Sequence, residues 1–425
     1  VNVNFEDLTG GNHVGVPQPP CSQCGDCVTG CNTGAKNTTL MNYLPDAVNH
    51  GAEIYTELEV LRISRRADGR YAVHFQSLGA GCEATDGPER SVAADLVILA
   101  AGTLGSTEIL LRSRAAGLAV SGQLGNGFTG NGDVLGFAYN CDDDINGVGI
   151  GGGELERDAQ GETIDPVGPC ITSVIDLRDG VPVDDGVIIE EGSLPGALAR
   201  VVPGPLALTD AVLGVGAERG VVDRLRKKWR ELVSIVAPRH GAMRRTQTYL
   251  VMGHEHSSGT MDLDPSDGRV RVSWSKIGED PRFERINERL IQTAQALGGS
   301  FVRNPLWTDA FKHRLFTVHP LGGCGMADSA ERGVVNHKGQ VFSGAAGDAV
   351  HDGLYVSDGS VIPRSLGCNP LLTISAITER AVALIAADRG WTIDYALPSR
   401  HASSGTTAGA AGAPGSSARP RRESA

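Results

Sequence analysis

Two stretches near the carboxyl end carry the side chains best suited to chemistry. Residues 317–323 spell T-V-H-P-L-G-G and place His319 in a turn. Histidine is the side chain most often used for proton transfer near neutral pH. Asn369-Pro370 precedes an apolar-periodic segment over residues 371–384, which predicts a helix with Asn369 as its N-cap. The first-turn N–H groups of such a helix favour an anion or an electron-rich ring edge.

A second group of reactive side chains lies near the amino end. Cys21, Cys24, Cys27 and Cys31 form a C-x2-C-x2-C-x3-C run. The spacing matches half of a bacterial ferredoxin pattern, but Asn32 follows the fourth cysteine where that pattern has Pro. Three arrangements fit the spacing: reduced thiols in a tight loop, a zinc ion or an iron–sulfur cluster, and a disulfide.

The elements that must position these side chains are strands that end in turns. Residues 96–99 are wholly apolar and lead through a glycine turn into a helix whose first turn holds Ser106. Residues 354–356 form another short apolar strand, which ends at Asp358. A buried parallel strand that runs into a helix N-terminus is typical of α/β sites for phosphate or ribose, although an ordinary strand-to-helix crossover has the same pattern.

These motifs resemble the glucose-methanol-choline (GMC) flavoprotein oxidoreductase family, and within it the bacterial cholesterol oxidase-like branch. The resemblance covers residues 319–385, the A-A-G-T-L-G-S run at 100–106 and the G-C-N-T-G-A-K-N loop at 30–37. It implies that His319 and Asn369 are catalytic and face the flavin ring where the substrate hydroxyl docks. It also implies FAD contacts at Ala101, Gly102, Thr103, Ser106, Gly347, Asp358, Gly359, Asn369, Pro370 and Leu371, with Asp358 near the ribityl and pyrophosphate part.

The same resemblance predicts the domain organisation. We expect an α/β (α+β) fold in which residues 1–130 and 318–395 form parts of an incomplete, doubly wound FAD-binding domain. Residues 131–317 would form a β-sheet substrate domain, and residues 396–425, which are rich in Ala, Gly and Ser, a disordered tail. Residues 125–130 spell G-x-G-x-x-G without a preceding strand or a following helix, so we interpret them as a turn. The amino-terminal dinucleotide-binding unit of the family is therefore predicted to be absent.

The net charge and the hydropathy of the chain limit the classes of partner that it is expected to bind. The chain has 425 residues, with 38 Lys and Arg against 50 Asp and Glu and a net charge of −12, which argues against nucleic-acid binding. It contains no apolar run of transmembrane length. It begins at Val1 without a Met or a leader, so we expect an internal fragment or a processed form. The compartment is left open, with a cytoplasmic or peripheral membrane location favoured.

A sheet over the flavin is predicted from three alternating segments. Residues 246–254, 259–264 and 269–274 are interpreted as adjacent antiparallel strands with one apolar face. The His-Glu-His triplet at residues 254–256 is interpreted as a surface turn rather than a zinc site, because adjacent residues on a strand alternate faces.

Residues 208–238 have a helical pattern with two possible roles. Their apolar stripe could lie against the protein's own domain, or it could lie on an anionic membrane. The stripe consists of Leu225, Trp229, Leu232, Val233 and Val236, and the basic residues around it are Arg224, Arg226, Lys227, Lys228 and Arg230.

The predicted activity is FAD-dependent oxidation of a bulky hydrophobic alcohol, and a sterol fits the resemblance best. His319 would act as base or hydroxyl orienter and Asn369 as hydrogen-bond partner, with oxygen as acceptor. Two alternatives stay open: a dehydrogenase that passes electrons to a cluster at the four cysteines or to another acceptor, and an inactive fragment. In cholesterol oxidases a further carboxylate serves double-bond isomerisation, but the matching residues 239–248 contain no Asp or Glu, which puts that step in doubt.

Overall fold

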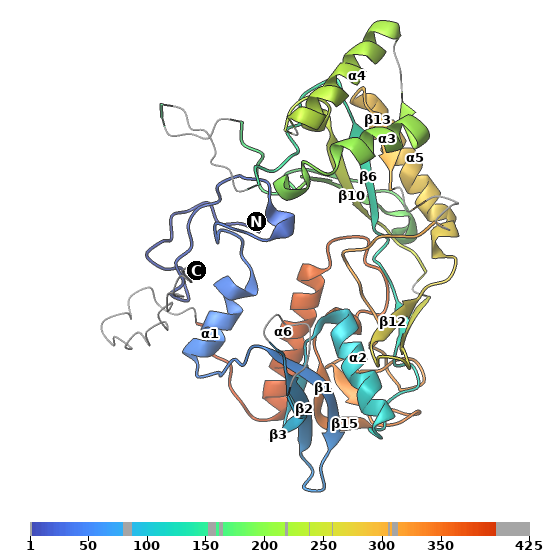
Figure 1. Cartoon of the computed structure of the whole chain (residues 1–425). Helices are drawn as coiled ribbons and strands as arrows, with labels where there is room; N and C mark the ends of the chain where they lie inside the picture. Colours follow the sequence, from blue (N-terminus) through green and yellow to red (C-terminus); the bar gives the residue numbers. More distant parts are fainter. Residues whose placement is uncertain are drawn as a thin grey trace, which may run out of the picture.

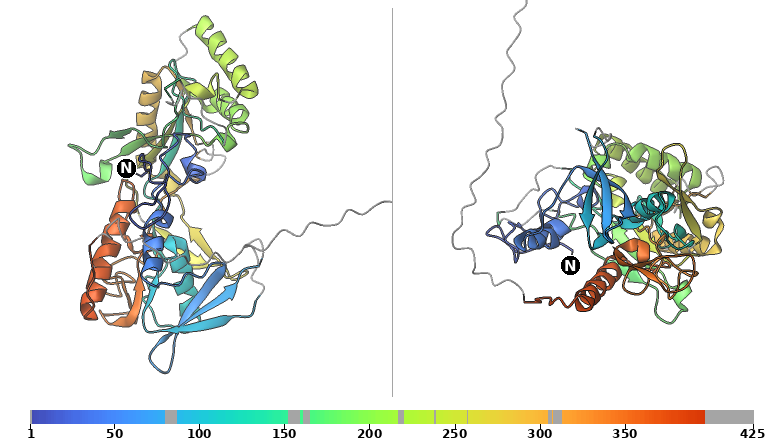
Figure 2. Two further views of the ribbon diagram at one scale, coloured as in Figure 1. Left: turned by 90° about the vertical axis from the view of Figure 1, so that its left-hand side faces the viewer. Right: turned by 90° about the horizontal axis from the view of Figure 1, so that it is seen from below.

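The computed structural model describes residues 2–79, 87–151, 159–160, 165–216, 220–237, 239–256, 258–304, 307 and 313–396. Cys82 and all but the first residue of the predicted tail lie outside these ranges. Two lobes are visible in Figure 1, and Figure 2 shows them from two further sides.

The lower lobe of Figure 1 is built around a short parallel pair of strands. β4 (Val97–Leu99) pairs in parallel with β15 (Val350–Val356), and β14 (Gln340–Phe342) pairs antiparallel with the other side of β15. Val97 and Leu99 are buried, as their apolar run predicted. α2 (Gly102–Ala115) follows β4 directly and packs Ile109 and Leu110 into the same core. The mixed α/β fold class is thereby confirmed.

Two further elements complete this lobe. β1 (Leu58–Arg65), β2 (Tyr71–Ser77) and β3 (Arg90–Ala94) form an antiparallel meander. α6 (Leu371–Asp388) lies beneath the upper lobe in Figure 1 and is joined to α1 (Tyr43–Asn49) by a hydrogen bond from the Tyr43 hydroxyl to Glu379 Oε1 of 2.6 Å.

The upper lobe contains a six-stranded antiparallel sheet. α5 (Pro281–Ala296) covers one face, where Phe283 and Leu290 pack against Tyr249 and Phe301. Phe137 and Val302 lie on the opposite face and pack against α3 (Pro203–Leu213). The order of the strands is β7 (Val174–Asp176), β8 (Ile188–Gly192), β10 (Gln247–Met252), β6 (Val134–Tyr139), β13 (Ser300–Arg303) and β9 (Val215–Gly216).

The predicted sheet over residues 246–274 is only half correct. β11 (Gly259–Leu263) and β12 (Val270–Ser273) pair antiparallel as expected. Their third strand, however, is β5 (Asn126–Phe128), whereas β10 belongs to the six-stranded sheet. Both edges of β10 are occupied, by β6 and β8, so β10 does not pair with β11. Between β10 and β11 the chain turns inward, where buried Glu255 accepts a hydrogen bond of 3.1 Å from the Gly130 amide.

The long helical pattern at residues 208–238 forms two helices, α3 and α4 (Val221–Val236). Figure 2 shows α4 at the outer end of the upper lobe, far from α6. Within the described part of the chain, none of the helices has the length and hydropathy needed to span a bilayer.

Candidate active site

Residues 129–133, which we call the connecting segment, hold the first predicted catalytic residue. The Oδ1 atom of buried Asp133 lies 3.0 Å from His319 Nδ1. Its Oδ2 atom accepts backbone hydrogen bonds from Val318 (2.8 Å) and His319 (3.1 Å). Because Asp133 occupies Nδ1, Nε2 is the imidazole nitrogen that remains for a substrate hydroxyl.

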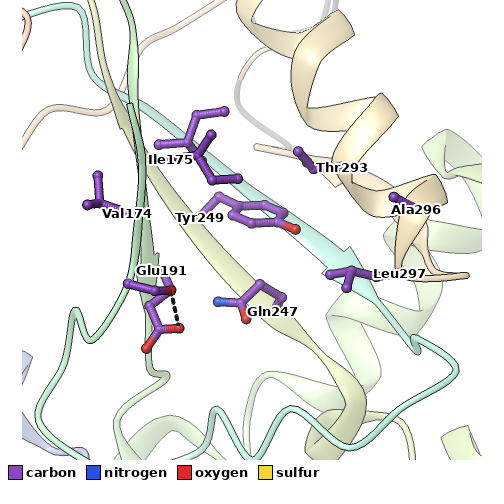
Figure 3. A pocket seen from close by; sticks show the side chains of 10 residues that line it. Val174, Ile175, Glu191, Gln247, Tyr249, Thr293, Ala296 and Leu297 are labelled. Carbon is purple, nitrogen blue, oxygen red and sulfur yellow. Dashed lines mark hydrogen bonds between the residues drawn. The ribbon is translucent and has the colours of Figure 1, made fainter. Parts of the chain in front are cut away.

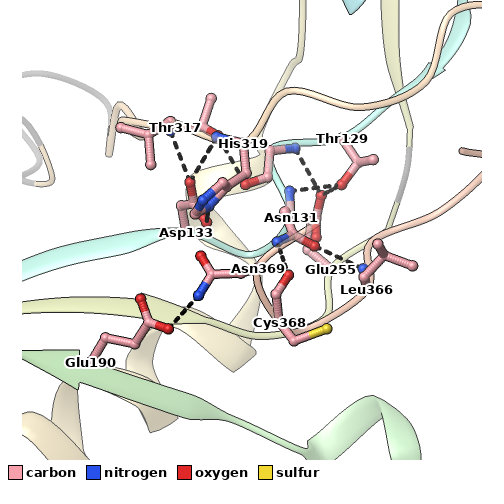
Figure 4. A network of polar contacts seen from close by, with 12 residues as sticks. Thr129, Asn131, Asp133, Glu190, Glu255, Thr317, His319, Leu366, Cys368 and Asn369 are labelled. Atoms are coloured by element: carbon pink, nitrogen blue, oxygen red, sulfur yellow. Dashed lines mark hydrogen bonds and ion pairs between the residues drawn. The ribbon is translucent and has the colours of Figure 1, made fainter. Parts of the chain in front are cut away.

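The connecting segment also holds the second predicted residue through Asn131 (Figure 4). The Asn131 amide donates to the Cys368 carbonyl (2.9 Å), and its Oδ1 accepts from the Leu366 amide (2.7 Å). Since Asn131 is fully buried, these bonds are shielded from water and fix the loop that carries Asn369.

Asn369 does not cap α6 as predicted. The helix begins one residue later than the sequence pattern indicated, with Pro370 at the N-cap position and no side chain bonded to the first-turn N–H groups. The Asn369 amide instead donates to Glu190 Oε1. The amide NH2 of Asn369 is thus bonded to a carboxylate, and its oxygen does not cap the helix. The first-turn N–H groups of α6 are left for an anionic or electron-rich group.

Glu190 is a site residue that sequence analysis missed. It comes from β8, is only 5% exposed, and its Oε2 has no hydrogen-bond partner. Burial raises the pKa of Glu190, and the charge of nearby Asp133 raises it further, whereas the hydrogen bond from Asn369 lowers this pKa, as does His319 whenever its imidazole is protonated. The sequence did contain a signal for this residue, because Glu190 directly follows the apolar run Val187-Ile188-Ile189. A charged side chain in a buried strand commonly has a function.

The predicted cofactor residues meet at the carboxyl ends of β4 and β15. Asp358 Oδ2 accepts from the Gly102 amide (3.0 Å) and the Ser106 hydroxyl (2.5 Å), and its Oδ1 accepts from the Ser360 amide (2.9 Å). Thr103 Oγ1 donates to the Pro320 carbonyl (2.7 Å), which ties the start of α2 to the His319 turn. Asp358 therefore holds the protein's own elements together with both carboxylate oxygens.

Gly359 lies between three of these elements. A Cβ atom at this position would lie 3.1 Å from Thr103 Oγ1, and 3.3 Å from Leu321 Cδ2 and from Ile374 Cδ1. The structure thus groups Ala101, Gly102, Thr103, Ser106, Asp358 and Gly359 around the end of this parallel pair. Pro370 and Leu371 stand at the start of α6, whose Ile374 lies beside Gly359.

Gly347 is not part of this group. It lies in the turn before β15, at the opposite end of that strand from Asp358. Its amide donates to the Glu331 carboxylate at 3.1 Å from each oxygen.

The interpretation of residues 254–256 as a surface turn is wrong for two of the three. His254 and Glu255 are buried, and only His256 is exposed. Burial raises the pKa of Glu255 and lowers the pKa of His254. The Thr129 hydroxyl donates to Glu255 Oε1, so this carboxylate supports the connecting segment.

The four clustered cysteines lie against loops of the upper lobe. Cys27 Sγ accepts a hydrogen bond from the Cys170 amide at 3.4 Å, and Asp26 Oδ1 accepts one from the Gly196 amide at 2.7 Å. All four are free thiols, and burial raises the pKa of Cys21 and Cys27. Among the described residues no group of three or more potential ligands is arranged to hold a metal ion. The predicted cluster therefore finds no support in the geometry.

A cavity of about 290 Å³ lies on the α5 face of the six-stranded sheet (Figure 3). Its lining includes Ile175, Tyr249 and Glu191. Neighbouring side chains on a strand point to opposite faces, so Glu191 lines this cavity whereas Glu190 faces Asn369. The cavity is therefore separate from the His319 site.

Comparison with known proteins agrees with this geometry. Two sequence profiles of the GMC oxidoreductase family match the chain, one at residues 7–129 and one at residues 255–378. The chain belongs to the GMC oxidoreductase family, whose members are flavoproteins that act on CH–OH groups. Both profiles include site residues described above, Thr129 in the first and His319 and Asn369 in the second.

Three individual proteins show how far the chain resembles known members and folds. The chain is 29% identical over 391 residues to a cholesterol oxidase of Mycobacterium tuberculosis. The aligned region covers 86% of this chain and 58% of that protein. It is 23% identical to a long-chain-alcohol oxidase of Arabidopsis thaliana, with 84% of this chain and 45% of the other covered. The fold is similar to that of an FAD-dependent oxidoreductase from Chaetomium thermophilum, with a TM-score of 0.52, 14% identity, and 85% of this chain and 66% of the other covered. The chain thus spans about 58% of the length of its curated cholesterol oxidase relative.

Proposed function

We propose that this protein oxidises the hydroxyl group of a bulky hydrophobic alcohol with FAD as its cofactor. The observation that carries the proposal is that the connecting segment holds both predicted residues, His319 through Asp133 and the loop of Asn369 through Asn131, while the Asn369 side chain is bonded to Glu190 (Figure 4). The side chains of Asp133, His319, Glu190 and Asn369 lie between the N-terminal end of α6 and the upper lobe. Family membership supplies the reaction class, and the network supplies the groups.

The residues present fit an FAD molecule. The unbonded first-turn N–H groups of α6 favour the negative charge that grows on a flavin edge during reduction. A hollow of about 630 Å³ lies along β4, which is an edge strand among the described residues, and its lining includes Ala101 and Gly105. When bound, FAD supplies the hydride acceptor for the carbinol carbon. The lower lobe, from residues 1–130 and 318–395, would hold the cofactor, and residues 131–317 most of the substrate.

His319 takes the hydroxyl proton in this proposal. With Nδ1 donating to Asp133, the neutral imidazole presents an unprotonated Nε2 to the substrate hydroxyl. The Asp133 carboxylate then stabilises the imidazolium that forms, because it lies within hydrogen-bond distance and is shielded from water. Asn369 orients the substrate oxygen or the flavin edge, and its own orientation is set by Glu190.

A sterol is our first candidate for the substrate, with a long-chain alcohol as the second. The sheet face that carries Glu190 also presents Leu135 and Leu250, which are opposite one another in the β6–β10 pairing. An apolar wall beside a few convergent polar groups suits a large hydrophobic alcohol. The cholesterol oxidase and long-chain-alcohol oxidase relatives match these two substrate classes. Oxygen is the acceptor we propose, since both are oxidases.

Glu190 supports a second activity, migration of a double bond in the ketone product. Residues 239–248 lack an acid, but β8 supplies a buried carboxylate from another part of the chain. Burial raises the pKa of Glu190, which makes the carboxylate a better base, and its Oε2 has no protein partner. Such a group can remove a proton beside a new carbonyl and return it elsewhere on the product.

Three measurements test the proposal. FAD binding to the purified chain is followed by flavin fluorescence, and reduction of bound flavin under anaerobic conditions is followed with cholesterol, a long-chain alcohol and glucose. We expect reduction by one of the hydrophobic alcohols and a loss of about 10²–10⁴ in its rate for His319→Gln. His337→Gln, at an exposed histidine of the same lobe, is the matched control. Equal rates for wild type and His319→Gln, or reduction by glucose alone, would contradict the proposal.

A further inference from the structure

The orientation of α4 is opposite to that of an ordinary amphipathic surface helix. Its apolar residues face outward, and both Leu225 and Trp229 are 67% exposed. The side chains that it buries are polar, with Lys227 at 8% exposure and Ser234 fully enclosed. A helix usually places its apolar stripe on the core, so an apolar stripe turned outward indicates a binding surface.

Specific polar contacts fix this orientation. Lys227 Nζ donates to the Gly298 carbonyl at 2.8 Å, and Arg230 donates to the Cys141 carbonyl at 3.0 Å. Ser234 Oγ accepts from the Met243 amide at 2.9 Å and donates to the His240 carbonyl at 2.5 Å. Rotation of the helix to bury its apolar stripe would break all of these bonds, so they hold the stripe outward.

The charged side chains of α4 are also divided between the face that packs on the protein and the face that is exposed. The acids Asp223 and Glu231 are turned toward the protein, with side chains 11% exposed, whereas Arg226 and Lys228 are 52% and 55% exposed. Arg224 and Lys228 lie along one edge of the apolar stripe and Arg226 along the other. The exposed ion pairs of these bases contribute at most about 1 kcal/mol each and can be exchanged for other anions.

We propose that α4, with the adjoining exposed residues of α3, binds the anionic surface of a lipid bilayer. An apolar stripe that contains Trp229 and is bordered by Arg and Lys is the pattern of a helix lying in the membrane interface. The long basic side chains reach outward to phosphate groups while their stems cover the stripe. Protein partners also bind surfaces that contain Trp and Arg, and the oligomeric state measured below separates that case from lipid binding. The members of this surface are Leu208, Val212, Val222, Leu225, Trp229, Leu232 and Val236, all more than half exposed.

The net charge of the chain does not oppose this binding at short range. The whole protein carries −12, but α4 has five basic residues against two acidic ones, and both acids face the protein. At physiological ionic strength charges are screened over about 8 Å, so a lipid surface in contact with α4 mainly senses the bases of that helix. The proposal depends on this surface and not on the oxidation activity proposed above.

Vesicle cosedimentation tests the proposal with the purified chain. The vesicles contain phosphatidylcholine alone or with about one third phosphatidylserine. We expect binding to the anionic vesicles, reduced about tenfold or more in Leu225→Gln/Leu232→Gln and about fivefold in Lys228→Glu. The controls are Leu40→Gln/Leu44→Gln, two exposed leucines of which the first precedes α1 and the second lies in its first turn, and Arg285→Glu on α5, which also has one carboxylate partner.

Each other outcome would overturn the proposal. A wild-type chain that stays in the supernatant with anionic vesicles does not use α4 as a lipid-binding surface. If wild type and both α4 variants bind the vesicles equally, the chain binds lipid through a surface other than α4. A chain that forms dimers which the leucine variant abolishes, with no vesicle binding, shows that α4 is a contact between copies. Far-ultraviolet circular dichroism checks folding, and Lys228→Glu remains informative if the double variant fails to fold.

Discussion

Asp133 Oδ1 lies 3.0 Å from His319 Nδ1, although the two residues are 186 positions apart in the chain. The same carboxylate accepts hydrogen bonds from the backbone amides of Val318 and His319. Ring and backbone of the proposed base are thus fixed by one side chain. Asp133 is therefore a positioning residue, and four predictions follow from the network around it.

Asp133→Asn should reduce the rate of flavin reduction by about tenfold or more while leaving FAD affinity unchanged. The asparagine oxygen will face the two backbone N–H groups, so its NH2 group will point to His319 Nδ1. That nitrogen must then accept, and Nε2 carries the proton and loses its role as base. Rapid anaerobic mixing measures the rate, and Asp143→Asn, an exposed carboxylate, is the control. A purely structural role would instead lower FAD affinity and stability together.

Glu190→Gln should stabilise the protein more at pH 7 than at pH 4. Burial raises the pKa of Glu190 in the folded protein, so the folded state holds more protons than the unfolded state above the unfolded pKa of about 4.3. The free energy of unfolding therefore falls as pH rises from that value to the folded pKa, by about 1.4 kcal/mol per pKa unit. Urea titrations at the two pH values measure the effect. A variant that gains no more stability at pH 7 than at pH 4 would contradict this prediction.

Asp358→Asn should lower the free energy of unfolding by about 1–3 kcal/mol. Both carboxylate oxygens accept bonds, from Gly102 and Ser106 on one side and from Ser360 on the other. An asparagine NH2 group cannot accept, so donors that are now paired lose their partner. Urea denaturation measures the change, with exposed Asp348→Asn as control. A stability equal to wild type would mean that Asp358 does not join β15 to α2.

Gly132→Ala should destabilise the protein more than Gly127→Ala. Both glycines have a positive φ, of 66° and 77°, so alanine costs about 1–2 kcal/mol at either position. At Gly132 a Cβ would also lie 2.5 Å from the carbonyl carbon of Gly253, whereas at Gly127 there is open space. The difference between the losses in the free energy of unfolding of the two variants measures the cost of the close approach to Gly253. The Gly132 variant should also reduce flavin more slowly, because the connecting segment carries Asp133.

The sequence determined the local elements and the reaction class. The apolar run at 96–99, the Asn369-Pro370 helix start and the His319 turn depend on short-range preferences, namely side-chain period, fixed proline φ and backbone capping. These predicted β4, α2 and α6 to within a few residues, and the same motifs identified the family.

The tertiary structure decided how distant segments meet. Glu190 and Asp133 reach the site from β8 and from the loop before β6, and no periodicity in the chain records that they converge on Asn369 and His319. Pairing with β6 and β8 occupied both edges of β10 and separated it from β11, and the contacts of Lys227 and Ser234 hold the apolar stripe of α4 outward. In each case hydrogen bonds between elements overrode the local pattern, because leaving buried polar groups unpaired costs more than the pattern contributes.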